Sequence, residues 1–86
     1  MTVHIPGALR SYTAQQGNVQ VEGATLADVV TALDRRYPGI RFRIVTEQDR
    51  IRPHIRIFVN EEQLQDLSAP LQRMDTVYIV CALSGG

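Results

Sequence analysis

The residues of this chain best suited to carry chemistry are its last five, Ala82-Leu83-Ser84-Gly85-Gly86. They follow directly on residues 76–80, an alternating apolar stretch typical of a β-strand. The two glycines leave the terminal carboxylate of Gly86 on a residue with no side chain. We interpret residues 82–86 as a flexible working tail, and residues 1–81 as the domain that presents it.

The other chemically capable side chains favour structural roles. Cys81 would be a nucleophile or a persulfide relay only with a base beside it, and the sequence places none there. A free cysteine on a strand is more typical of a small core residue. His4 and His54 are far apart in sequence, so they indicate neither a metal site nor a catalytic pair, and we expect both at the surface.

Composition excludes several classes of function. The 86 residues indicate one domain, and nine basic residues balance nine acidic ones, so net charge favours neither nucleic acid nor an anionic membrane as partner. The single cysteine excludes an internal disulfide. There is neither an apolar run of about 20 residues nor a signal peptide, and we expect a cytoplasmic protein.

All basic residues are arginines, and five of them form a run in the middle of the chain: Arg41, Arg43, Arg50, Arg52 and Arg56. We expect this run to be a solvated face, with contact to an acidic groove of a partner as the alternative.

Four alternating stretches predict half-buried strands, at residues 2–5, 18–22, 55–59 and 76–80. Residues 25–37 carry apolar side chains at helical spacing, with Thr25 as N-cap and Asp28 three residues later, a weaker form of the capping box. Residues 40–45 fit a strand and a short helical turn equally, and Gln63-Leu64 fits a very short strand. The order predicts an α+β domain, a mixed sheet of four to five strands packed on one main helix.

Motifs along nearly the whole chain match one known family in order and spacing. They are Val3-His4-Ile5-Pro6 with Leu9-Arg10, Gly23-Ala24-Thr25-Leu26 with Leu33 and Tyr37-Pro38-Gly39, Phe58-Val59-Asn60-Glu61, Leu71 with Asp75, Val77 and Ile79, and Ser84-Gly85-Gly86. With them the chain resembles the ubiquitin-like β-grasp sulfur carriers of molybdopterin, thiamine and cysteine biosynthesis. It looks closest to the cysteine-biosynthesis type. Two positions depart from the family pattern: Met74-Asp75 replaces Gly-Asp, and Cys81 replaces Pro.

The resemblance implies a carrier and not an enzyme, with no bound cofactor or metal. A ubiquitin-activating-type adenylating and sulfurtransferase enzyme would use ATP to activate the carboxylate of Gly86. Sulfur would then replace an oxygen, and a sulfur-accepting synthase would consume the thiocarboxylate in a cysteine-type or secondary-metabolite pathway. Leu83, Ser84 and Gly85 would enter the partner's active site, where a Cβ on either glycine would obstruct a narrow channel.

The strand pattern also predicts a docking surface for that partner. One face of the sheet is expected to show His4, Arg56, Phe58, Tyr78 and Val80. No second helix is available to cover an apolar cluster there, so we expect it to contact the adenylating enzyme. The alternative is that these residues only line the far side of the sheet.

Two other functions stay open at this point. A ubiquitin-like modifier would be conjugated to other proteins through Gly86, although the absence of lysine forbids ε-linked chains of this protein on itself. A non-catalytic β-grasp interaction module would make no use of the terminal glycines.

Overall fold

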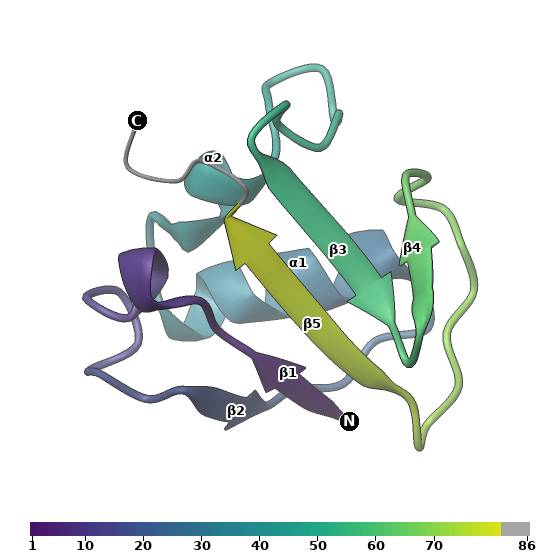
Figure 1. Ribbon diagram of the computed structural model, residues 1–86, viewed down its shortest axis with the longest axis horizontal. Helices are drawn as coiled ribbons and strands as arrows, with labels where there is room; N and C mark the ends of the chain where they lie inside the picture. Colours follow the sequence, from purple (N-terminus) through teal and green to yellow (C-terminus); the bar gives the residue numbers. More distant parts are fainter. Residues whose placement is uncertain (82–86) are drawn as a thin grey trace.

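The strand that precedes the tail, β5 (Thr76–Cys81), lies at the centre of a five-stranded mixed sheet. The computed structural model describes residues 1–81, and residues 82–86 lie outside the described part. The strand order is β2-β1-β5-β3-β4 (Figure 1). The other strands are β1 (Thr2–His4), β2 (Asn18–Gln20), β3 (Ile55–Val59) and β4 (Glu62–Leu64).

The pairing of β5 gives the sheet its mixed character. It runs parallel to β1 and antiparallel to β3, while β1–β2 and β3–β4 are antiparallel pairs. The predicted strands at 2–5 and 18–22 are confirmed but shorter, since regular pairing stops at His4 and Gln20. Every second residue of β3 is buried, which matches the alternation in its sequence.

Helix α1 (Leu26–Arg36) crosses one face of the sheet (Figure 1). The capping box at its start is complete: the Asp28 amide donates to Thr25 Oγ1, and the Thr25 amide donates to Asp28 Oδ2, both at 3.2 Å. Its buried stripe consists of Leu26, Val29, Val30 and Leu33. Because these side chains meet the inner face of the sheet, packing compensates for the modest helix propensity of the two valines.

Residues 40–44 form a second, short helix, α2 (Ile40–Ile44), so the strand alternative for this stretch is wrong. Gly39 precedes it with φ at 100°, a left-handed conformation that glycine adopts without strain. The Asp34 carboxylate accepts the amides of Gly39 and Arg41, each at 3.1 Å, and so ties the start of α2 to α1. Ile40 and Ile44 are buried one helical turn apart.

A single apolar core fills the space between the sheet and the two helices. Its fully buried members from the sheet are Val3, Ile57 and Val77, and α1 adds Leu26 and Leu33. Within residues 1–81, no helix is long and apolar enough to cross a membrane.

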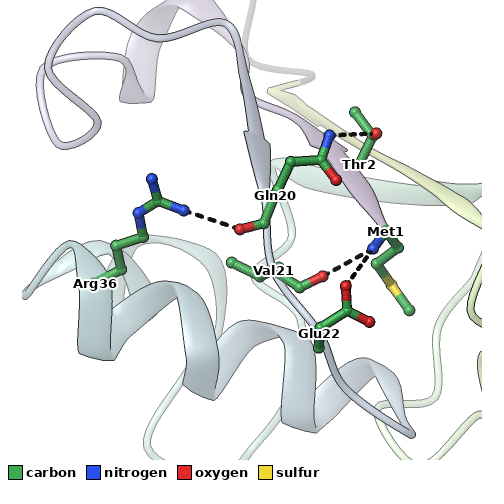
Figure 2. Close-up of polar contacts among 6 residues, drawn as sticks. All are labelled: Met1, Thr2, Gln20, Val21, Glu22 and Arg36. Atoms are coloured by element: carbon green, nitrogen blue, oxygen red, sulfur yellow. Dashed lines mark hydrogen bonds and ion pairs between the residues drawn. The ribbon is translucent and has the colours of Figure 1, made fainter.

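The end of the edge strand β2 is tied both to the start of the chain and to α1 (Figure 2). The Met1 α-amino group donates to the Val21 carbonyl at 3.1 Å and to Glu22 Oε2 at 3.0 Å. The Arg36 guanidinium donates to the Gln20 carbonyl at 2.9 Å. These contacts join the end of β2 to the start of the chain and to α1.

The turn before β5 forms without the glycine that the family usually carries. Met74 is 89% exposed and is not among the residues with positive φ. Asp75 closes the turn, because its carboxylate accepts the Gln72 amide at 2.7 Å and the Asn60 side-chain amide at 3.1 Å. The Asn60 side-chain oxygen in turn accepts the Thr76 amide at 3.1 Å. The first residue of β5 is therefore fixed by side-chain contacts.

Candidate functional site

The strand β5 continues to Cys81, the last residue that the structure describes. Cys81 pairs with Ile55 in the ladder between β5 and β3, so the strand is one residue longer than the expected 76–80. Cysteine keeps the backbone amide that proline lacks, and here it extends the pairing of β5 with β3. The tail residues predicted to act lie outside the described part of the chain: Leu83, Ser84, Gly85 and Gly86. Their roles stay predictions.

Cys81 lies beside a small hollow near the end of β5. The hollow has a volume of about 360 Å³, and its lining also includes Tyr12, Arg43 and His54. Arg43 Nε donates to the Tyr12 hydroxyl at 2.7 Å. Burial raises the pKa of the Cys81 thiol above its ordinary value, which disfavours the thiolate. The direction is opposite to the lowered pKa of an activated cysteine, and Cys81 is partly buried against the core.

The register of the sheet brings the predicted docking residues together on its outer face, the side opposite α1. Tyr78 of β5 pairs with His4 of β1 on one side and with Phe58 of β3 on the other. The His4 and Tyr78 rings stack with centroids 4.4 Å apart and planes 3° from parallel. In the next row toward the end of β5, Val80 pairs with Arg56. The expectation that these five side chains share one face is confirmed.

This outer face is partly apolar and open. Tyr78 is 38% exposed and Val80 is 41% exposed, while Phe58 is half-buried between its neighbours. The intervening residues Val77 and Ile79 point the other way and are buried in the core. The two helices pack on that inner side, so the described residues place no layer over Tyr78 and Val80. An aromatic and aliphatic surface next to the end of β5 is suited to contact another protein.

A second concave surface lies at the β4 side of the sheet and was not predicted from the sequence. It is lined by the start of α1, the loop over residues 49–53, the first residues of β3 and residues 63–68. Four arginines of the mid-chain run contribute to its lining. The sequence showed the run of arginines, but not that residues 63–68 lie across from it.

Residues 1–81 contain no group of three or more histidine, cysteine or acidic side chains placed to hold a metal ion. The two histidines are also separated from each other. His4 stacks on Tyr78, and His54 is exposed in the hollow beside Cys81.

Comparison with known proteins gives one consistent result over the whole chain. The sequence profile of the ThiS family matches residues 3–86. The sulfur carrier protein CysO of Mycobacterium tuberculosis is 32% identical over 91 residues, which cover 100% of this chain and 98% of that protein.

Solved structures agree with the sequence match. A chain in the crystal structure of the Amycolatopsis orientalis BexX/CysO complex superposes with a TM-score of 0.91 at 33% identity, covering 99% of this chain and 98% of that one. The crystal structure of Mycobacterium tuberculosis CysO gives a TM-score of 0.91 at 31% identity, over 95% of this chain and 98% of that one.

Proposed function

The chain belongs to the ThiS family and is a homologue of the sulfur carrier protein CysO, and we propose that Gly86 is the residue that carries the sulfur. The observation that carries the proposal is similarity to a sulfur carrier over the full chain, through the terminal glycines. The fold is the ubiquitin-like β-grasp of the CysO structures.

The chemistry at Gly86 proceeds in two steps, both performed by partners. In the first, a carboxylate oxygen attacks the α-phosphate of ATP, and pyrophosphate leaves to give an acyl-adenylate. In the second, a sulfur nucleophile attacks the acyl carbon and AMP leaves, so that one oxygen is replaced by sulfur. The domain itself supplies no catalytic group, and it binds no cofactor in this mechanism.

The domain's contribution is to position the end of β5 and to dock. Cys81, which pairs with Ile55 in the ladder between β5 and β3, starts the tail from a fixed point. Ordering the tail inside a partner costs roughly 1–2 kcal/mol per residue, so contacts elsewhere must offset that loss. The outer face around Tyr78 and Phe58 supplies them by burying apolar area on the adenylating enzyme.

The partners follow from this chemistry. The chain engages an adenylating and sulfurtransferase enzyme first and a sulfur-accepting synthase second. A sulfur-accepting synthase of a cysteine-type pathway fits the homology to CysO. The cytoplasmic location expected from the sequence remains a prediction.

Intact-mass measurement tests the proposal. The purified chain is incubated with a candidate adenylating enzyme, ATP and a sulfide source, and a mass gain of one oxygen-to-sulfur exchange is expected. Omission of ATP is the first control, and a chain lacking Gly86 is the second. A gain that survives deletion of Gly86 would contradict the assignment of the site. An isopeptide between Gly86 and another protein, with no thiocarboxylate, would indicate a modifier instead.

A further inference from the structure

The groove at the β4 side of the sheet adjoins the outer face at Arg56, which belongs to both surfaces. It has a volume of about 1100 Å³. Strand β4 pairs with β3 only from Ile57 to Val59, so Ile55 and Arg56 extend beyond it (Figure 1). Both of these residues line the groove. The start of β3 therefore extends beyond β4, and there the Ile55 amide donates to the Arg52 carbonyl at 2.9 Å while the Ile55 carbonyl accepts Arg56 Nη1 at 3.2 Å.

The lining of the groove is more basic than the rest of the chain. It contains four arginines and two aspartates: Arg41, Arg50, Arg52, Arg56, Asp49 and Asp66. The whole chain is neutral, so an excess of two positive charges in one concavity is a local feature. Guanidinium groups bind carboxylates in pairs of parallel hydrogen bonds, which makes this lining complementary to acidic side chains.

The arginines differ in how many donors they have left. Arg41 pairs with the Asp49 carboxylate. Arg52 Nε donates to the Phe42 carbonyl at 2.6 Å, and its guanidinium lies 4.5 Å from the Phe42 ring centroid. Within residues 1–81, the guanidinium of Arg50 makes no hydrogen bond or ion pair with another side chain or carbonyl. Among the described residues, Arg50 therefore keeps all its guanidinium donors available, and Arg52 retains part of its own.

The loop that carries Arg50 is braced, so its guanidinium extends from a fixed point. Val45 and Ile51 form a β-bridge at the base of the loop. The Thr46 amide donates to the Arg50 carbonyl at 2.8 Å, and Thr46 Oγ1 accepts the Arg50 amide at 3.2 Å. Asp49 adopts a left-handed conformation, with φ at 60°, at the tip. A preorganised loop loses less entropy when a ligand binds.

We propose that this groove binds an extended segment of a partner protein rich in aspartate and glutamate. The groove is larger than the usual site for a small molecule, which has a volume of about 300–1,000 Å³. Its lining runs from the first turn of α1 to the start of β3. The groove lies near the end of β5, because Ile55 lines the groove and pairs with Cys81. The proposal does not depend on sulfur transfer.

Amide chemical-shift mapping by NMR tests the proposal on the full chain. The probe is a heptapeptide of alternating glutamate and valine, and the same peptide with glutamine in place of glutamate is the control probe. Shifts caused by the glutamate peptide are expected at residues 49–56 and 63–68, and the glutamine peptide is expected to cause none. Binding should weaken between about 20 mM and 200 mM salt, since exposed charges are screened.

Charge reversal separates a specific groove from general attraction. The double variant Arg50→Glu/Arg52→Glu is expected to weaken binding by at least about tenfold. The matched variant Arg35→Glu/Arg73→Glu has the same change in net charge at two exposed sites outside the groove, and it should bind as the wild type does. Amide spectra of both variants must first show the native fold. If Arg52→Glu unfolds the chain, Arg50→Glu alone is the test.

Three results would overturn the proposal. Equal loss in both double variants would mean attraction by net charge alone. Shifts confined to the outer face would place the acidic segment there. Tighter binding by a single-stranded oligonucleotide of equal charge would identify the surface as one for nucleic acid.

Discussion

A single glycine determines how closely the chain approaches the first turn of α1. A Cβ placed on Gly23 would lie 2.7 Å from the Val29 amide nitrogen and 2.9 Å from Asp28 Cβ. The Val29 amide is backbone of the helix and cannot rotate away, so Gly23→Ala should shift the chain. We expect it to lower the free energy of unfolding by roughly 1–3 kcal/mol, as overpacking does. Urea denaturation followed by circular dichroism measures the loss.

Gly7→Ala is the matched control, because nothing lies within 4 Å of a Cβ at Gly7. It should leave stability within about 0.5 kcal/mol of the wild type. Similar melts for the two variants would remove the close approach at Gly23 as a constraint on the fold.

A second residue-scale prediction concerns the thiol of Cys81. Burial raises its pKa, so the folded chain holds the proton to higher pH than the unfolded chain does. The rate of alkylation by iodoacetamide should therefore begin to rise at a higher pH in the folded protein than in the urea-unfolded protein. The unfolded chain is its own control, since it contains the same single cysteine. A folded-state profile shifted to lower pH would instead indicate an activated thiol and revive the relay hypothesis.

At the scale of elements, the capping box at the start of α1 makes a measurable contribution to the free energy of unfolding. Thr25→Ala removes the oxygen that accepts the Asp28 amide, and it should lower the free energy of unfolding by about 1 kcal/mol. Thr31→Ala, an exposed position in the middle of the same helix, should be neutral or slightly stabilising because alanine has the better helix propensity. Equal losses in urea melts of the two variants would contradict the role of the cap.

Local patterns were sufficient to predict those elements whose signals lie within one stretch of sequence. The capping residues Thr25 and Asp28 and the alternation of β3 are such signals, and both are confirmed. The stretch 40–44 was ambiguous because Ile40 and Ile44 fit both a period of two and a helical turn. A contact from α1 favours the helical alternative, since the Asp34 carboxylate accepts amides at the start of α2. That contact depends on how Gly39 turns the chain, which no periodicity encodes.

The outer face was predictable and the groove was not, for a related reason. Residues on one face of paired strands follow from alternation once the register is known, so His4, Phe58 and Tyr78 could be grouped in advance. The groove combines loops whose distance in space follows from the complete packing. Residues 63–68 carry no basic or apolar pattern that would connect them to Arg50.

At the scale of the whole molecule, the two surfaces proposed for binding share strand β3, which lies beside β5. Strand β5 ends at Cys81, and its outward residues Tyr78 and Val80 form part of the outer face. Strand β3 contributes Phe58 to that face and Ile55 to the groove. One partner can therefore receive the tail while it covers the outer face. This arrangement predicts that docking and chemistry can be separated by mutation.

Phe58→Ala tests that separation. The side chain lies between Tyr78 and the β4 side of the sheet, and its removal takes apolar area from the docking face while Gly86 is unchanged. We expect the KM of the adenylating enzyme for this carrier to rise about tenfold or more, with kcat changed less, because the lost contact stabilises bound carrier and transition state alike. Phe42→Ala is the control, since Phe42 is 58% exposed on α2 and lies outside the outer face. Unchanged kinetics in a folded Phe58→Ala protein would mean that the outer face does not dock this enzyme. A fall in kcat with constant KM would mean that the aromatic face acts on the chemical step.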